Sequence, residues 1–165
     1  MKTLFIGGVK SGKSRLAEAY ILEQSPAAKP YYLATTEFID AEMAERIQVH
    51  QQRRQNLFLN LEAPVHLFDA LKTCQQPVLV ECVSMWLNNM LYHQIPTDAI
   101  LQELEAVMQL PVDLVLVHNE VGLGVIPDNP LARQYIDLSG KAAQLMGQAC
   151  DSVFFCSAGL TLRMK

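Results

Sequence analysis

The sequence lacks the features of several classes of protein. It has no apolar run near the roughly 20 residues of a membrane span. The apolar stretch at its start, residues 4–6, is far too short for a signal peptide. Lys and Arg are not clustered, and the net charge is −4. Because nucleic-acid binding needs basic side chains that displace phosphate counterions, we expect no DNA or RNA partner. Because the sequence has neither a signal peptide nor a membrane span, we expect a cytoplasmic protein.

Cysteine is scarce, and its spacing matches no known site. Cys74, Cys82, Cys150 and Cys156 form no C-x-x-C pair and no spacing typical of metal ligands. We expect buried thiols in a reducing compartment, with a zinc site or a disulfide as the less favoured alternatives. Repeats, low-complexity tracts and linkers are also missing. The length of 165 residues, half of them hydrophobic, predicts one globular domain over residues 1–165.

The strongest positive feature is a glycine-rich loop between an apolar run and a helical pattern. Residues 7–14 have the spacing Gly-x4-Gly-Lys-Ser of a phosphate-binding P-loop. Glycines let the backbone curl until several amides point inward, and the next helix adds the positive end of its dipole. Lys13, predicted to be catalytic, is placed to reach the β- and γ-phosphates of a nucleotide. The predicted nucleotide-binding residues here are Gly7, Gly8, Val9, Lys10, Ser11, Gly12, Lys13, Ser14 and Arg15.

Short apolar runs alternate with helical patterns along the whole chain. This order is typical of a mostly parallel sheet with helices on both faces. The predicted strands are 3–6, 31–34, 78–81, 114–117 and 153–156, and residues 160–164 could add an antiparallel edge strand. The predicted helices are 13–24, 40–54, 65–73, 84–92, 98–108 and 131–149. With the P-loop, this pattern predicts an α/β fold of the P-loop NTPase, RecA-like type.

Residues that follow the predicted strands are candidates for the site, because ligands collect at the carboxyl ends of parallel strands. Glu81 ends the third strand, where P-loop enzymes place the acid, more usually Asp, that holds Mg²⁺ through water. A carboxylate ending a buried strand is costly without such a partner. We therefore predict that Ser14 and Glu81 form a Mg²⁺ site, in preference to a structural ion pair at Glu81.

Polar residues also follow the second and fourth strands. Ala34, Thr35, Thr36 and Glu37 could bind a ligand or cap the next segment, and the residues alone favour neither. After the fourth strand, a polar cluster and a glycine-rich stretch occupy residues 118–127. A surface loop without a ligand would look much the same. This stretch also lacks the Lys and Asp of the guanine-reading signature of switch GTPases.

The predicted helix 40–54 carries a histidine among arginines. Its first turn is acidic and its last turn basic, which matches the helix dipole at both ends. Helical spacing places Arg46, His50 and Arg53 or Arg54 along one side. Positive neighbours lower the pKa of an imidazole and favour its neutral, nucleophilic form. The same arginines could hold phosphate oxygens, although an ordinary solvated helix face has the same composition.

Together these motifs resemble the bifunctional adenosylcobinamide kinase and adenosylcobinamide-phosphate guanylyltransferase family. The resemblance covers nearly the whole chain. Residues 119–127, Asn-Glu-Val-Gly-Leu-Gly-Val-Ile-Pro, are nearly private to that family, whereas many unrelated proteins share the P-loop. The other matching segments are 7–18, 32–36, 42–47, His50 with Arg54, Glu62, 81–82 and 131–133.

The resemblance implies a two-step enzyme of cobalamin biosynthesis. Adenosylcobinamide is first phosphorylated with ATP or GTP; GMP from GTP then passes through a covalent histidine to adenosylcobinamide phosphate, giving adenosylcobinamide-GDP. By family position the histidine is His50. The resemblance also implies a homo-oligomer, with a trimer as the expected state. Beyond the P-loop, the implied GTP-binding residues are Ala34, Thr35, Thr36, Glu37, Gln51, Gln52, Arg53, Arg54, Glu62 and Glu81.

Three alternatives stay open from the sequence. Some members of the family carry two adjacent histidines where this chain has Val49-His50, and guanylyl transfer would be lost here if the first were the reactive one. The chain could instead be a P-loop kinase of another small metabolite, with His50 a bystander. A nucleotide-dependent switch or recombinase-like ATPase acting on nucleic acid is disfavoured by the acidic charge balance.

Overall fold

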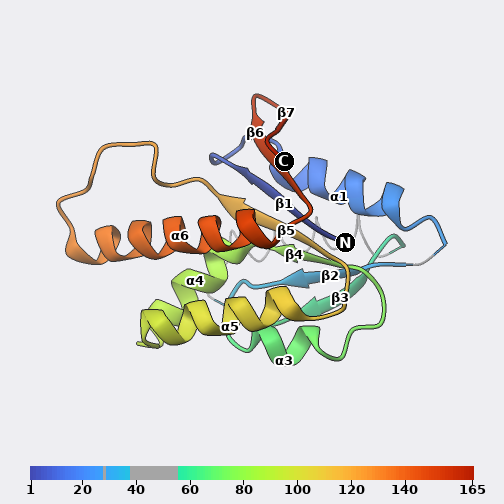
Figure 1. Ribbon diagram of the computed structural model, residues 1–165, viewed down its shortest axis with the longest axis horizontal. Helices are drawn as coiled ribbons and strands as arrows, with labels where there is room; N and C mark the ends of the chain where they lie inside the picture. Colours follow the sequence, from blue (N-terminus) through green and yellow to red (C-terminus); the bar gives the residue numbers. More distant parts are fainter. Residues whose placement is uncertain (28, 38–55) are drawn as a thin grey trace.

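The chain folds around one sheet of seven strands in the order β3-β2-β4-β5-β1-β6-β7 (Figure 1). The computed structural model describes residues 1–27, 29–37 and 56–165. Neighbouring strands pair in parallel except for β6 and β7, which are antiparallel. The mostly parallel sheet and the antiparallel edge strand are therefore confirmed. The strands are β1 (Lys2–Gly7), β2 (Tyr31–Ala34), β3 (Leu59–Glu62), β4 (Val78–Glu81), β5 (Leu114–Asn119), β6 (Ser152–Ser157) and β7 (Leu160–Arg163).

Helices cover both faces of the sheet, as the alternation of elements predicts (Figure 1). Helix α1 (Lys13–Gln24) packs on one face. The helices α3 (Leu67–Leu71), α4 (Val83–Tyr92), α5 (Thr97–Gln109) and α6 (Pro130–Ala149) cover the other. Side chains alternate between the two faces along β1, because Phe5 joins the core under α1 while Leu4 and Ile6 join the core on the opposite side. The central strands are buried on both faces, which explains their continuous apolar runs.

The sequence analysis missed strand β3. Its residues, Leu-Asn-Leu-Glu, are exposed or half-buried, so they show no buried apolar run. The strand forms because its backbone pairs with β2 at the edge of the sheet, where Tyr31 lies opposite Leu59. The predicted helix 65–73 is also shorter, spanning Leu67–Leu71. The predicted helix 40–54 lies outside the described residues.

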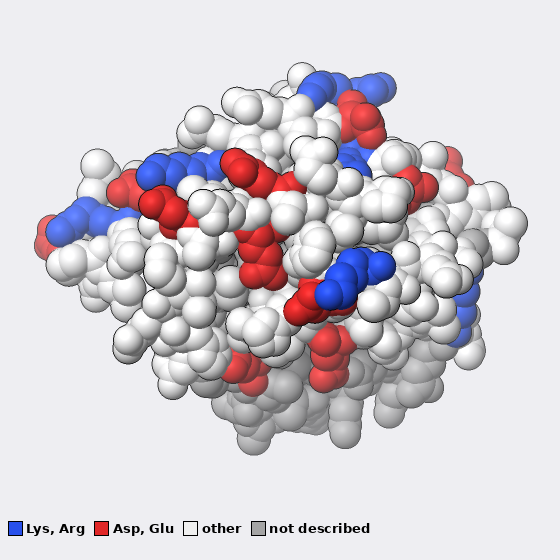
Figure 2. Space-filling view, turned by 60° about the horizontal axis from the view of Figure 1, so that its bottom comes forward, with Lys and Arg blue, Asp and Glu red and all other residues white. Residues whose placement is uncertain are grey.

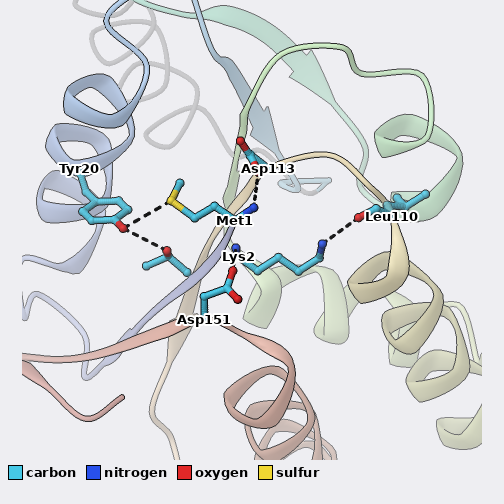
Figure 3. Close-up of polar contacts among 7 residues, drawn as sticks. Met1, Lys2, Tyr20, Leu110, Asp113 and Asp151 are labelled. Atoms are coloured by element: carbon cyan, nitrogen blue, oxygen red, sulfur yellow. Dashed lines mark hydrogen bonds and ion pairs between the residues drawn. The ribbon is translucent and has the colours of Figure 1, made fainter.

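A hydrogen-bonded cluster closes the end of the sheet where β1 begins (Figure 3). The Met1 ammonium forms an ion pair with Asp113, at the start of β5. The Lys2 backbone amide donates to Asp151 Oδ2 at 2.6 Å, just before β6. The Lys2 ammonium donates to the Leu110 carbonyl at 2.8 Å, at the end of α5. These contacts tie β1 to both neighbouring strands at their amino ends and to the carboxyl end of α5.

The described residues contain neither a membrane-spanning helix nor a disulfide. No helix there is both long and apolar enough to cross a lipid bilayer. On the face drawn in Figure 2, the Lys and Arg side chains of described residues are scattered among Asp and Glu and form no continuous basic surface. All four cysteines are free thiols; Cys150 and Cys156 are buried as expected, whereas Cys74 and Cys82 are only half-buried.

Candidate active site

The P-loop curls as its glycine spacing predicts. Residues 7–14 run from the last residue of β1 into the first turn of α1. Gly12 has a φ of 93° and Lys10 a φ of 57°, both in the left-handed region that reverses the chain direction. The Ser11 amide donates to the Gly8 carbonyl at 3.2 Å and closes the turn. The loop therefore lies at the amino end of α1, where amides and the helix dipole favour an anion.

The turn between β6 and β7 packs against the P-loop. The Gly159 amide donates to the Ser11 carbonyl at 2.9 Å. A Cβ on Gly12 would lie 3.0 Å from the Gly159 Cα, and one on Gly7 would lie 2.3 Å from the Cys156 carbonyl oxygen. These positions require glycine because backbone approaches backbone. The sequence analysis missed this support, because Ala158-Gly159 is not one of the usual hairpin pairs, such as Asn-Gly or Asp-Gly.

Lys13 is held against the loop that it closes. Its side chain is buried, and its ammonium donates to the Gly8 carbonyl at 3.1 Å. A bound polyphosphate would offer this ammonium charged oxygens, which form stronger hydrogen bonds than a neutral carbonyl. The position of Lys13 therefore fits the phosphate-binding role predicted for it.

Ser14 and Glu81 lie together, as the proposed Mg²⁺ site requires. The Ser14 hydroxyl, in the first turn of α1, donates to Glu81 Oε1, at the end of β4, at 2.7 Å. A hydroxyl and a carboxylate are oxygen ligands, the type that Mg²⁺ prefers. Protein usually supplies only part of the shell of this ion, with water and phosphate oxygens completing it. The two residues therefore fit Mg²⁺ bound beside a nucleotide.

The strand register places three of the predicted nucleotide-binding residues side by side on neighbouring strands. Ala34, the last residue of β2, lies opposite Glu62 of β3 on one side and Glu81 of β4 on the other. Because these strands are parallel, all three residues end at the carboxyl edge of the sheet, where the P-loop also lies. Glu62 is exposed and accessible to a ligand.

The side chains after β2 bind other parts of the chain. Thr35 is buried, and its hydroxyl donates to the Cys82 carbonyl at 2.8 Å and accepts from the Cys82 amide at 3.1 Å. Glu37 pairs with His93 Nε2 at 2.7 Å, at the end of α4. Thr36 is half-buried. Nucleotide binding by this segment stays a prediction, and its polar groups fix the segment next to β4.

Asn89 is a structural residue of the site that the sequence analysis missed. It is buried in α4, and its Nδ2 donates to the Thr35 carbonyl at 2.7 Å and to the Pro64 carbonyl at 2.9 Å. One amide group thus fixes the segments that follow β2 and β3. The signal in the sequence is that Asn89, unlike its neighbour Asn88, falls on the apolar side of the helical pattern, where a buried polar group needs partners.

A buried histidine organises the end of β5. The Asn119 amide donates to Ser84 Oγ at 2.6 Å. The hydroxyl proton of Ser84 is therefore directed to His118 Nδ1, which accepts it at 3.1 Å. On this assignment His118 Nε2 carries the proton and donates to Ser139 Oγ at 3.0 Å. Burial is the main cause that lowers the pKa of His118, the hydrogen bond with Ser139 opposes it, and the Lys13 charge adds to it, so that the pKa is about 4. The imidazole is therefore neutral and joins α4, β5 and α6.

A cavity of about 520 Å³ opens beside the P-loop. Its size is typical of a small-molecule site. It lies between α1 and residues of β2, β4 and the segment before β3, so Lys13, Ser14 and Glu81 face one space. The described residues that line it are Lys10, Gly12, Lys13, Ser14, Arg15, Glu18, Leu22, Tyr32, Leu57, Phe58 and Glu81.

The remaining predicted site residues lie outside the described part of the chain. These are the candidate nucleophile and the turn after it, His50, Gln51, Gln52, Arg53 and Arg54. Their roles stay predictions.

Two solved structures have folds similar to that of this chain. A KaiC-like protein of Pyrococcus horikoshii matches 93% of this chain with a TM-score of 0.53 and 11% identity, over 69% of its own length. The flagellar accessory protein FlaH of Methanocaldococcus jannaschii matches 93% of this chain with a TM-score of 0.51 and 8% identity, over 70% of its length. At such low identity these likenesses show the fold alone, which confirms the predicted RecA-like type.

Sequence comparison gives closer relatives. The chain is 37% identical to the "Bifunctional adenosylcobalamin biosynthesis protein CobP" of Pseudomonas aeruginosa, over 100% of this chain and 98% of the relative. It is 33% identical to the "Bifunctional adenosylcobalamin biosynthesis protein CobU" of Escherichia coli, over the full length of both. Residues 3–164 match the model of a family described as "Cobinamide kinase / cobinamide phosphate guanyltransferase". The resemblance seen in the motifs is confirmed, and the chain belongs to the cobinamide kinase / cobinamide phosphate guanyltransferase family.

Proposed function

We propose that this chain phosphorylates adenosylcobinamide and then transfers GMP from GTP to the product. The observation that carries the proposal is the hydrogen bond of 2.7 Å between Ser14 and Glu81, beside Lys13 at the 520 Å³ cavity. This arrangement suits a nucleoside triphosphate with Mg²⁺. Membership of the family over residues 3–164 identifies the acceptor as a cobinamide.

The kinase step depends on positioning and charge neutralisation. The hydroxyl of the aminopropanol arm attacks the γ-phosphorus of ATP or GTP and loses its proton to solvent, and the bond from that phosphorus to the β-phosphate oxygen breaks. P-loop amides hold the phosphates, and Lys13 offsets the charge that develops on them. Bound Mg²⁺ would supply further charge neutralisation, with Ser14 and Glu81 as the residues that hold it. This step needs no protein nucleophile.

Guanylyl transfer joins two negatively charged reactants, so a neutral protein nucleophile makes the displacement easier. His50 attacks the α-phosphorus of GTP, loses its ring proton to solvent and releases pyrophosphate. An oxygen of adenosylcobinamide phosphate then attacks the same phosphorus, the bond from phosphorus to the ring nitrogen breaks, and the freed histidine takes up a proton from solvent. Arg46, Arg53 and Arg54 offset the charge of the departing pyrophosphate. Adenosylcobinamide-GDP is the product.

The substitution His50→Ala separates the two activities. Because only guanylyl transfer needs the nucleophile, the variant keeps phosphorylation of adenosylcobinamide and loses covalent labelling by α-³²P-GTP. The wild-type label should be acid-labile and base-stable, as expected of a phosphoramidate. His66→Ala is the matched control, because His66 is exposed at the start of α3. Labelling that survives in the His50 variant would show that another residue is the acceptor.

Incubation of the wild-type protein with adenosylcobinamide, ATP and GTP tests the acceptor itself. Mass analysis of the corrinoid should show the phosphate and then the GDP derivative. A phosphate product alone would favour a single-activity kinase and would agree with a reactive histidine at the first position of the family's pair, where this chain has Val49. No modified corrinoid would contradict the proposed function.

The assembly and the location of the protein are also part of this proposal. We expect a homo-oligomer, a trimer by resemblance, in the cytoplasm. Light scattering on the eluting protein would measure its molar mass and test the trimer directly.

A further inference from the structure

The segment between β5 and α6 exposes an unusual amount of apolar surface. Leu123, Val125 and Ile126 are 80%, 95% and 78% exposed. The loop extends away from the sheet beyond the end of β5 (the orange segment in Figure 1). Single exposed apolar residues are ordinary, but a cluster of them usually marks a binding surface. Covering such side chains with a ligand removes apolar surface from water and therefore favours binding.

Hydrogen bonds hold this segment at both ends. The Gly122 amide donates to Glu120 Oε1 at 2.6 Å. At the other end the Arg133 guanidinium donates to the carbonyls of Pro127 and Asp128 at 3.0 and 2.7 Å. The apolar side chains are therefore presented by an anchored loop.

The base of the loop touches the P-loop. The Glu120 amide donates to the Gly7 carbonyl at 3.0 Å, and Asn119 lies opposite Gly7 in the strand register. Because β1 and β5 are parallel neighbours, the loop and the P-loop leave the sheet at the same edge. A ligand on the loop can therefore extend one arm toward the phosphates.

The loop also offers open backbone groups. In the described part of the chain, no hydrogen bond joins the amides of residues 123–126 to another protein group. Residues 121–127 include no charged side chain. A hollow of about 270 Å³ separates the loop from α6 and is lined by Val121, Gly122, Gly124, Val125, Ile126, Pro127, Arg133, Ile136 and Asp137. The surface thus combines apolar contacts with free amides.

We propose that residues 121–127 bind the corrin macrocycle of adenosylcobinamide. The inference rests on the proposed function, since it assigns a site to the acceptor of that reaction. A corrin ring carries methyl groups and carboxamide arms around its rim, while the axial ligands of cobalt occupy its faces. The methyl-bearing rim packs against Leu123, Val125 and Ile126, and the carboxamide oxygens accept hydrogen bonds from the open amides. The aminopropanol arm then reaches the γ-phosphate over Gly7.

Contact with a second copy of the chain is the competing use of this surface. The hydrogen bond between Glu120 and Gly7 favours the corrinoid, because it places the apolar side chains in continuity with the phosphate site. A subunit contact has no need of that continuity. The two uses make different predictions for substrate binding and for molar mass.

The double variant Leu123→Ser, Val125→Ser tests the proposal. Losing two apolar contacts should raise the KM for adenosylcobinamide by about tenfold or more, while the KM for GTP and the molar mass stay unchanged. Equilibrium dialysis with adenosylcobinamide alone should show the same loss of affinity. The matched control is Leu162→Ser, Met164→Ser, which removes two exposed apolar side chains on and beside β7. The control should bind both substrates normally.

Each other outcome overturns the inference. An unchanged KM for adenosylcobinamide would place the macrocycle elsewhere. A changed molar mass with unchanged corrinoid affinity would assign the loop to contact between copies. A rise in the KM for both substrates would show that the loop acts through the shape of the P-loop. By contrast, failure of the wild-type protein to modify adenosylcobinamide would contradict the proposed function itself.

Discussion

The two ends of strand β1 carry polar groups with different tasks. At its amino end, Lys2 makes hydrogen bonds with Asp151 and Leu110, so the polar groups of the chain pair with one another (Figure 3). At its carboxyl end, Lys13 and Glu81 line an open cavity. The comparison shows that charged side chains stabilise the fold where they bind other groups of the chain. Where they line an open cavity, the same kinds of side chain can bind a ligand.

Replacing Lys13 and Lys2, one at a time, should give the largest difference between the two ends of β1. Lys13→Met keeps the apolar stem and removes the ammonium, so both activities should fall by about 10²–10³-fold or more. Lys2→Met is the matched control and removes only the hydrogen bond to the Leu110 carbonyl. It should leave both activities unchanged. Steady-state assays of phosphorylation and guanylyl transfer, with melting temperatures of both variants, make the measurement.

The Lys13 result also tests whether one loop serves both reactions. If only one of the two activities fell, a second triphosphate site would be required. If Lys2→Met lowered activity as much as Lys13→Met, the division between the two ends of β1 would be wrong.

The buried His118, at the carboxyl end of β5, makes the stability of the protein depend on pH. The unfolded chain takes up a proton near pH 6.5, whereas folded His118 does so only near its lowered pKa of about 4. Between these values the unfolded state binds more protons, so the free energy of unfolding falls as the pH is lowered. The full loss is about 3 kcal/mol and is complete below pH 4.

Denaturant titrations across this pH range measure the effect. His118→Asn keeps an acceptor for Ser84 but does not titrate, so its stability should depend less on pH over the same interval. It should be less stable than the wild type at neutral pH, because the contact with Ser139 is lost. An equal slope in both proteins would mean that other groups cause the acid sensitivity.

Patterns within short stretches of sequence were enough to predict most of the strands and helices, the P-loop and the position of Glu81. The P-loop follows from the spacing of its glycines, and Glu81 follows from a carboxylate at the end of an apolar run. The core strands β1, β4 and β5 are buried on both faces, so their apolar runs are continuous. In each of these cases the signal lies within a few neighbouring residues.

The parts that sequence reasoning missed depend on contacts between distant segments. Strand β3 has half-exposed side chains and exists through backbone pairing with β2. Gly159 supports Ser11 across 148 positions, and Asn89 fixes two loops that it does not adjoin. No local pattern specifies such partners. They become visible only when the order of strands is known.

The smallest expected effect comes from the amino end. Asp151→Ala removes the acceptor of the Lys2 amide and should lower the free energy of unfolding by about 1 kcal/mol, because the bond is exposed and water replaces it in part. Glu105→Ala is the control, since Glu105 is exposed in the middle of α5. Both variants should keep full kinase and guanylyl-transfer activity. Loss of activity in Asp151→Ala without loss of stability would mean that the amino-end cluster reaches the phosphate site through β1, and that the two ends of the strand are not independent.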